Sequence, residues 1–248
     1  MDFLDITMTA VLRKDILDRT LRSFKENLFR DFPCRLIINI DPVGDDKIID
    51  VMTTALKYFD CHFNIPEHPN FSKAYKWVFT QAQSEYIFHL EDDWELLKPL
   101  KLEDMFSLMN RRKDLATLRL PYRISTERSK NWTTFFDFDG DVFICPSNEK
   151  LSVGFCGHPS LIRKSFMDNC VPFINTDKNP EKQFHYGPKP IMNQVLKYNY
   201  GVYQKPYEKE YVKDIGRHWL IKTKWRKQGI KAFFTRWERI PETEQLEG

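Results

Sequence analysis

The sequence predicts an α/β protein in which helices cover both faces of a mostly parallel sheet. Over the first half of the chain, short apolar runs alternate with segments whose apolar residues recur at helical spacing. This alternation is typical of parallel sheets, because each helix returns the chain to start the next strand in the same direction. With 248 residues, 42% of them hydrophobic and 15% aromatic, the chain can bury the core of one large domain. The composition excludes disordered, collagen-like and coiled-coil proteins.

The elements of the first half follow from two criteria, apolar runs and periodicity. Residues 35–40 contain the run Leu36-Ile37-Ile38, as in a strand buried on both faces, and the turn residues of 41–44 are expected to end it. In residues 14–29 apolar side chains recur every three or four positions, which predicts a helix. The expected order is strand 4–10, helix 14–29, strand 35–40, helix 47–59, strand 61–65, helix 71–83, strand 85–90, helix 101–109 and strand 116–120.

The second half does not continue this alternation. The aromatic segment 132–145 predicts a β-hairpin with its turn at Asp139-Gly140. A helix at 160–169, a polar, proline-rich loop at 176–190 and a short helix at 191–198 are expected to follow. We expect one domain, 1–248, made of the α/β half 1–121, a smaller β/α part at 122–204 and a basic, aromatic tail at 205–248.

Charge, cysteines and targeting signals narrow the class further. The formal net charge of +3 excludes a polycation but leaves room for a local basic patch. The N-terminus carries acids and no basic segment ahead of an apolar run, so it does not predict a secretory signal, and no apolar run is long enough for a transmembrane segment. The five cysteines are odd in number and lack zinc-site spacing. These features predict a reduced, cytoplasmic protein.

An acidic cluster, Glu91-Asp92-Asp93-Trp94, directly follows the expected strand 85–90. Ligands of α/β proteins bind at the carboxyl ends of the strands, where this cluster is expected to lie. Carboxylates at alternate positions of an extended segment can face the same way and hold Mg²⁺ or Mn²⁺ together with diphosphate oxygens. The alternative is a solvated acidic turn, which is the commoner fate of an acidic run.

Several stretches in the right order resemble family-2-like glycosyltransferases with the GT-A fold. Residues 86–94, Tyr-Ile-Phe-His-Leu-Glu-Asp-Asp-Trp, are similar to the DXD region of that family. Residues 9–13 are similar to its first strand–helix unit, 39–42 to the end of its second strand and 70–74 to the segment before its third helix. The resemblance implies a stand-alone GT-A enzyme of viral or bacterial type, with a Rossmann-like nucleotide-sugar half at 1–121 and an acceptor half at 122–204.

The resemblance also implies roles for residues of the first half. Thr9, Arg13 and Asp41 would frame the nucleoside of a sugar-nucleotide donor, with Lys73 near the nucleotide. Asp93 would be the direct ligand of Mn²⁺ or Mg²⁺, which acts as a Lewis acid for the departing diphosphate. Glu91 or Asp92 would contact the ribose or a metal-bound water. Because the first acid of the cluster is Glu rather than Asp, the division of roles between Glu91 and Asp92 stays open.

The second half supplies candidates for the base and for further donor contacts. An inverting transfer needs an Asp or Glu that deprotonates the acceptor hydroxyl. Residues 157–163 resemble the family's stretch leading toward that acid; Glu181 is the first candidate and Asp177 the substitute, although Glu181 also suits a helix start. By resemblance, His218 would be a C-terminal metal ligand or diphosphate contact, and Arg217 could neutralise phosphate. A structural role is the alternative for His218.

Residues 222–239 of the tail are basic and aromatic. They hold seven Lys and Arg side chains against one acid, Glu238, with tryptophans and phenylalanines between them. Three interpretations compete: a solvated helix that packs its aromatics on the domain, an amphipathic segment on an anionic membrane, and a groove for nucleic acid.

The sequence therefore predicts a metal-dependent, inverting glycosyltransferase that moves a hexosyl or pentosyl group from a UDP-sugar, or another sugar nucleotide, to a hydroxyl of a glycan or lipid-linked saccharide. A second acceptor class is a hydroxymethylated base of viral DNA, flipped out of the duplex in the host cytoplasm. Two different functional classes also compete with this prediction. One is a nucleotidyltransferase, whose glycine-rich phosphate loop is missing from residues 9–14, and the second is a non-catalytic nucleic-acid-binding domain.

Overall fold

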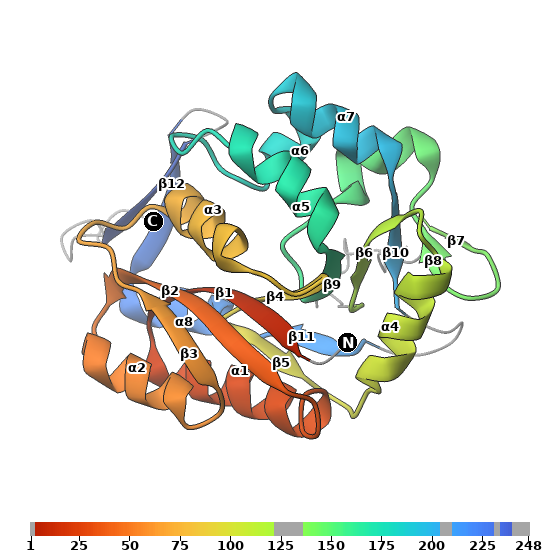
Figure 1. The fold of residues 1–248 in the computed structure, drawn as a ribbon. Helices are drawn as coiled ribbons and strands as arrows, with labels where there is room; N and C mark the ends of the chain where they lie inside the picture. Colours follow the sequence, from red (N-terminus) through yellow and green to blue (C-terminus); the bar gives the residue numbers. More distant parts are fainter. Residues whose placement is uncertain (1–2, 122–135, 204–209, 231–233, 240–248) are drawn as a thin grey trace.

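The computed structural model describes residues 3–121, 136–203, 210–230 and 234–239, and among them it has a nine-stranded central sheet (Figure 1). The strand order is β3-β2-β1-β4-β9-β6-β10-β8-β7. All strands of this sheet except β8 and β9 run in the same direction, as their pairings require. The α/β prediction, with a mostly parallel sheet, is confirmed. The strands are β1 Leu4–Leu12, β2 Cys34–Gly44, β3 Asp60–Asn64, β4 Tyr86–Glu91, β6 Leu115–Arg119, β7 Asp137–Phe138, β8 Phe143–Ile144, β9 Ser160–Arg163 and β10 Asn199–Val202.

Helices cover both faces of the sheet, and each face has its own apolar core. One core includes the buried side of α1, where Leu17, Leu21 and Phe24 are fully buried. Strand β1 is buried along its whole length because it has helices above and below it. The helices of the first face are α1 Lys14–Asn27, α2 Ile48–Leu56 and α4 Leu102–Arg111; those of the second are α3 Phe71–Gln81, α5 Lys164–Cys170, α6 Gln183–Tyr186 and α7 Lys189–Lys197.

Strand β2 is longer than predicted, and the expected end at the turn residues 41–44 is wrong. Ala10 pairs with Ile40 and Leu12 with Gly44, so a bulge absorbs the residues between the two pairs. Pro42 has no backbone N–H to offer a partner, and a bulge is one of the few places in a sheet that accepts it. Gly44 has a φ of 125°, which favours glycine. The bulge keeps Asp41 at the carboxyl edge of the sheet.

The helix expected at 160–169 begins only at Lys164. Residues Ser160–Arg163 instead form β9, which lies antiparallel between β4 and β6 and is buried throughout. Burial of Arg163 is possible because its guanidinium donates to the carbonyl oxygens of Leu115 and Met109. The sequence pattern also did not predict α6, β10 or the small antiparallel sheet formed by β5 Trp94–Leu96 and β11 Val212–Asp214.

The hairpin expected at 132–145 is confirmed for β7 and β8, with Gly140 in its turn at a φ of 100°; residues 132–135 lie outside the described residues. The helical interpretation of the tail is wrong beyond α8 Arg217–Thr223. After Lys224, with a φ of 60°, the chain forms an antiparallel hairpin of β12 Trp225–Ile230 and β13 Phe234–Arg239. No helix among the described residues is long and apolar enough to cross a membrane.

Candidate active site

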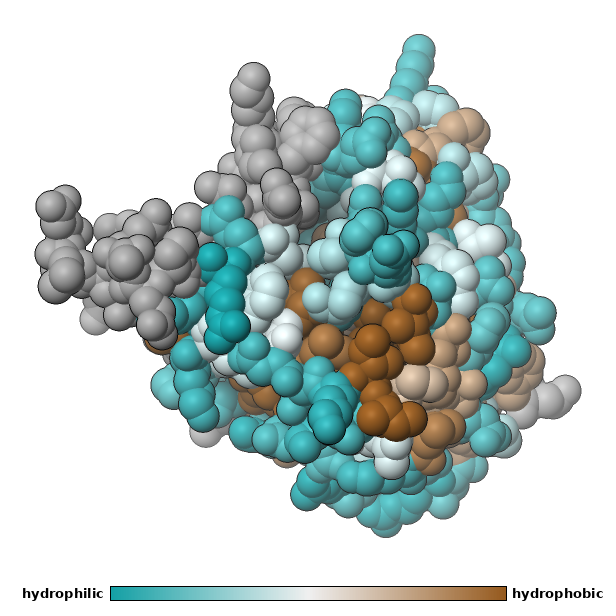
Figure 2. All heavy atoms as spheres, turned by 90° about the vertical axis from the view of Figure 1, so that its left-hand side faces the viewer, coloured by the Kyte–Doolittle hydropathy of each residue, from teal (hydrophilic) through white to brown (hydrophobic). Residues whose placement is uncertain are grey.

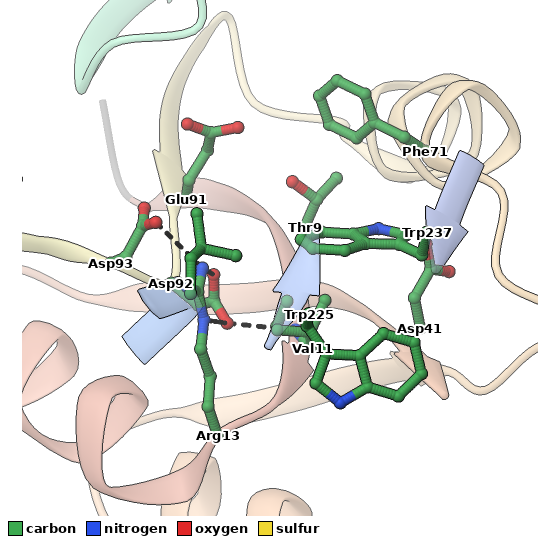
Figure 3. A pocket seen from close by; sticks show the side chains of 12 residues that line it. Thr9, Val11, Arg13, Asp41, Phe71, Glu91, Asp92, Asp93, Trp225 and Trp237 are labelled. Atoms are coloured by element: carbon green, nitrogen blue, oxygen red, sulfur yellow. Dashed lines mark hydrogen bonds and ion pairs between the residues drawn. The ribbon is translucent and has the colours of Figure 1, made fainter. Parts of the chain in front are cut away.

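A pocket of about 360 Å³ opens where β1, β2 and β4 end (Figure 3). Because these strands are parallel neighbours, Thr9 of β1 pairs with Asn39 on one side and Glu91 on the other. The pocket falls in the range of about 300–1,000 Å³ that is usual for small-ligand sites. Its lining residues are Thr9, Ala10, Val11, Arg13, Asp41, Phe71, Glu91, Asp92, Asp93, Leu220, Trp225 and Trp237. The strand-end location predicted for the acidic cluster is therefore confirmed.

Within the acidic cluster, Asp92 faces inward. Its Oδ2 accepts hydrogen bonds from Arg13 Nε at 2.9 Å and from the backbone N–H of Val11 at 3.0 Å, and Arg13 Nη2 contacts its Oδ1. Asp92 is only 2% exposed. Its backbone oxygen accepts from Thr20 Oγ1 at 2.8 Å, which ties the cluster to α1. The hydrogen-bonding capacity of the Asp92 carboxylate is thus directed to the protein.

Asp93 is the more accessible acid, with 22% of its side chain exposed. Its Oδ2 accepts from Arg13 Nη2 at 2.9 Å, and its backbone oxygen accepts from the N–H of Ile215 at 2.8 Å. Gly216 packs so closely that an added Cβ would lie 2.1 Å from Asp93 Oδ2. The segment after β11 therefore holds the Asp93 side chain from one side.

Arg13 neutralises both aspartates from a buried position. Burial by itself would lower the pKa of Arg13, but the carboxylates of Asp92 and Asp93 outweigh it and raise the pKa above its ordinary value. The guanidinium also lies 5.2 Å from the ring centre of Trp219, within cation–π range. Arg13 therefore stays charged at every physiological pH.

A chain of amides supports the far side of the pocket. Asn39 Nδ2 donates to Asp41 Oδ1 at 2.9 Å, and Asn64 Nδ2 donates to Asn39 Oδ1 at 2.6 Å. Asp41 is 4% and Thr9 8% exposed, and both line the pocket. The chain fixes the orientation of the Asp41 carboxylate, so that it can accept a hydrogen bond from a ligand in a defined direction.

Glu91 is half-buried at the end of β4, and its Oε2 lies 3.5 Å from Trp94 Nε1. Asp92 and Glu91 thus differ in environment: the first is enclosed by Arg13 and Val11, and the second lines the pocket from the strand end.

Three further residues predicted as donor contacts do not line the pocket. Lys73 is exposed on α3, where its backbone N–H donates to the N-cap Asn70, and Arg217 and His218 are exposed in the first turn of α8. Within the described part of the chain, no group of three or more His, Cys, Asp or Glu side chains is placed to hold a metal ion. Asp93 and His218 therefore do not form a preassembled protein metal cage.

The two base candidates differ in their surroundings. Glu181 is half-buried, and its Oε1 accepts the backbone N–H of Gly157 at 2.7 Å. Asp177 is exposed in a turn in which its own N–H donates to Asn175 Oδ1. The buried Tyr75 has its pKa raised, mainly by desolvation and then by the charge of Glu181, with a smaller effect of Glu91. Glu181 and Glu91 therefore lie within electrostatic reach of one hydroxyl group.

His158 lies beside the Gly157–Glu181 contact. Its ring packs edge-on against Trp94, with 5.3 Å between ring centres. Desolvation and the nearby Arg119 lower the pKa of His158 to about 3, against the opposing charges of Glu181 and Asp214. The imidazole of His158 is therefore neutral, rather than an imidazolium, near neutral pH.

The aromatic side chains of the pocket were missed as site residues. Phe71 opens α3, and Trp225 and Trp237 come from the hairpin β12–β13 (Figure 3). The sequence did signal the tail as unusual through its interleaved aromatic and basic residues. It contained no indication that this segment lies over the strand ends of the first half, because that depends on how the chain returns from β11.

Comparison with known proteins agrees with the fold described above. A model of the family "Glycosyl transferase family 2" matches residues 5–170. No curated protein matches the sequence significantly. The fold is similar to that of TarS from S. aureus, with a TM-score of 0.60 at 12% identity over 86% of this chain and 36% of that chain.

Two further structures were determined with ligands. TarS 1-349 in complex with UDP has a TM-score of 0.59 and 13% identity over 86% of this chain and 60% of that chain. The mannosyltransferase PcManGT from Pyrobaculum calidifontis, in complex with GDP-Man and Mn²⁺, has a TM-score of 0.54 and 10% identity over 82% and 55%. At these identities the likeness shows the GT-A fold, and the chain spans between 36% and 60% of the length of these proteins.

Proposed function

The chain belongs to glycosyl transferase family 2, and from this premise we propose that it transfers a sugar from a UDP-sugar to a hydroxyl of a glycan or lipid-linked saccharide, with a divalent metal and with inversion at the anomeric carbon. The observation that carries the proposal is the pocket itself. Asp41, Glu91 and Asp93 converge there from two strand ends, beside the cation of Arg13.

In this proposal the nucleoside lies between the ends of β1 and β2. Asp41 accepts a base N–H, in the orientation set by Asn39, and Thr9 borders the same space. Glu91 takes the ribose hydroxyls, since the carboxylate of Asp92 is already engaged by Arg13 and Val11. UDP is preferred to GDP because the TarS structures with UDP and UDP-GlcNAc resemble the chain more closely than the structure with GDP-Man does.

The chemistry of the donor set fits a hard divalent cation such as Mn²⁺ or Mg²⁺. Such ions prefer oxygen ligands and are commonly held by one or two carboxylates together with substrate phosphates. Asp93 would hold the ion, and the donor diphosphate would complete its coordination, so that no cage of three protein ligands is needed. When bound, the ion supplies Lewis-acid stabilisation of the charge on the diphosphate. Arg13 orients Asp93 toward this task.

Glu181 serves as the base in the proposed reaction. Its free oxygen takes the proton of the acceptor hydroxyl as that oxygen attacks the anomeric carbon, while the bond from this carbon to the diphosphate oxygen breaks. The products are the glycosylated acceptor, the nucleoside diphosphate and a protonated Glu181. The hydrogen bond from Gly157 to Oε1 fixes the carboxylate and leaves Oε2 for the proton.

Ligand-induced thermal stabilisation tests the donor assignment. UDP and UDP-sugars with Mn²⁺ should raise the melting temperature, and GDP with Mn²⁺ should raise it less. Absence of a shift with every nucleotide would refute the donor site. Acceptors can then be compared by mass spectrometry, with glycans, lipid-linked saccharides and hydroxymethylated DNA as parallel substrates. Transfer to the DNA alone would replace the proposed acceptor class.

A further inference from the structure

One wall of the pocket comes from outside the segment that the family model matches. That segment ends at residue 170, whereas Leu220, Trp225 and Trp237 follow it by fifty residues or more in the sequence. The site is therefore completed by residues near the C-terminal side of the described chain. This segment presents two indole rings to a pocket that also contains four acidic side chains, Asp41, Glu91, Asp92 and Asp93.

The pairing of the hairpin explains why both rings point the same way. Trp225 pairs with Arg239, and Lys227 pairs with Trp237. Residues directly opposite each other share a face of an antiparallel pair, so Trp225 and Trp237 are diagonal neighbours on one face. On the same face, Arg239 Nη1 lies 3.6 Å from Asp45 Oδ1, just beyond the end of β2. The ion pair and the pocket lining both place this face of the hairpin near the end of β2. This is the side of the pocket that we propose for the nucleoside.

The pocket remains open with the two indoles in place, at about 360 Å³. In Figure 3, Trp237 lies beside Thr9 and Asp41, with Phe71 on one side of it and Trp225 on the other. Figure 2 shows that apolar residues reach the surface on the side of the molecule that lies at the left in Figure 1.

We propose that the face of the hairpin bearing Trp225 and Trp237 is the stacking surface for the nucleobase of the donor, with Asp41 reading the edge of the base. The inference rests on the proposed function, because it assigns the base subsite of the same pocket. Aromatic side chains bind bases through their faces, and a carboxylate at the ring edge adds selectivity for a base with an N–H.

This proposal also gives the basic, aromatic tail a role in donor binding. Trp225 and Trp237 line the donor pocket, and Arg239 forms an ion pair with Asp45, which belongs to the nucleotide-sugar half of the chain. An aromatic groove for an acceptor nucleic acid is therefore not needed to explain these two tryptophans. They explain instead how a pocket with so many carboxylates can bind a flat, weakly polar ring.

The test compares UDP binding by wild type and by Trp237→Leu and Trp237→Phe, measured by calorimetry with Mn²⁺. Loss of one stacking contact should weaken UDP binding about 5- to 150-fold in Trp237→Leu, which keeps apolar packing but has no aromatic face. Trp237→Phe should stay within a few-fold of wild type. Equal UDP affinities for wild type and Trp237→Leu, or tighter binding by Trp237→Leu, would overturn the stacking assignment.

Inorganic pyrophosphate with Mn²⁺ is the matched probe, because it lacks the base. Trp237→Leu should bind it as wild type does, and a parallel loss of pyrophosphate binding would assign the indole a merely structural role. Trp77→Phe is the control variant, since Trp77 packs on His62 away from the pocket. If wild type binds no nucleotide at all, the proposed function fails; if it binds UDP and Trp237→Leu binds equally well, only the stacking inference fails.

Discussion

Arg13 and Asp92 form a buried, two-point ion pair: Arg13 Nε donates to Asp92 Oδ2 at 2.9 Å, and Nη2 contacts the other carboxylate oxygen. The same Nη2 reaches Asp93 Oδ2 at 2.9 Å. One cation thus divides two adjacent acids into an inward, structural carboxylate and an outward one that can serve a ligand. The division explains how consecutive aspartates can perform different tasks.

Asp92→Asn should strongly destabilise the protein, because it leaves the buried guanidinium of Arg13 only partly compensated. Breaking a buried ion pair by removing one partner costs about 3–5 kcal/mol. Equilibrium unfolding in guanidinium chloride measures the change. Asp93→Asn is the matched control, and its more exposed side chain should cost clearly less. Equal losses in the two variants would contradict the division of roles.

Gly216→Ala and Gly157→Ala should separate donor binding from transfer. A Cβ at Gly216 would meet Asp93 Oδ2 at 2.1 Å, and one at Gly157 would meet Glu181 Oε1 at 2.2 Å. Neither glycine has a positive φ, so the effects are steric. Gly216→Ala should raise the Kd for UDP with Mn²⁺ about tenfold or more, as expected for a displaced ligand. Gly157→Ala should leave that Kd unchanged and lower kcat; the reverse pattern would refute both assignments.

Glu181→Gln should lower kcat by about 10²–10⁴, the usual contribution of general base catalysis. The Kd for UDP should not change, because Glu181 is not part of the donor pocket. Single-turnover transfer and calorimetry measure the two quantities. Asp177→Asn, at an exposed turn, is the control and should keep wild-type turnover. Loss of turnover in Asp177→Asn with an active Glu181→Gln would move the base to Asp177.

Because of His89, the protein should be less stable in mild acid than at neutral pH. Desolvation lowers the pKa of His89 to about 3 from an ordinary 6.5, against the smaller opposing effect of its hydrogen bond with Thr7. Below pH 6.5 the unfolded chain therefore takes up a proton that the native state rejects until the pH approaches 3. The free energy of unfolding should drop by about 1.4 kcal/mol between pH 7.5 and 5.5 through this residue.

Denaturant unfolding of His89→Asn at both pH values checks this expectation. The variant should lose about 1.4 kcal/mol of the pH dependence, whatever its overall stability. His68→Asn, at an exposed position, should retain the wild-type pH dependence. An unchanged slope in His89→Asn would show that His89 is already protonated in the native state or is not desolvated.

The first half of the fold was predictable because its signals are local. Runs such as Leu36-Ile37-Ile38 and the period of α1 report burial directly, and parallel order follows from their alternation. Strand β9 was not predictable in this way. The sequence predicts its residues as the start of the following helix. They form a strand because they pair with β4 on one side and β6 on the other. The predicted end of β2 was wrong for a similar reason: a β-bulge accommodates Pro42, so the strand continues to Gly44.

The candidate site was predictable to the extent that it lies on strand ends. The acidic cluster was expected there because it directly follows an apolar strand, and Thr9, Arg13 and Asp41 were expected at the same site from the family resemblance. The inward orientation of the Asp92 side chain was not predictable, because it depends on a hydrogen bond from Arg13, which directly follows β1. The position of Trp225 and Trp237 likewise depends on pairing within the hairpin and on the path of β11.

The most direct test of the central claim is mass-spectrometric detection of nucleoside diphosphate released from sugar nucleotides, with wild type and Asp93→Asn compared under identical Mn²⁺ concentrations. Wild type should release UDP from at least one UDP-sugar, faster when its acceptor is added, and Asp93→Asn should lose most of this activity. Release at the same rate by both proteins, or no consumption of any sugar nucleotide by wild type, would contradict the assignment of this pocket to sugar transfer.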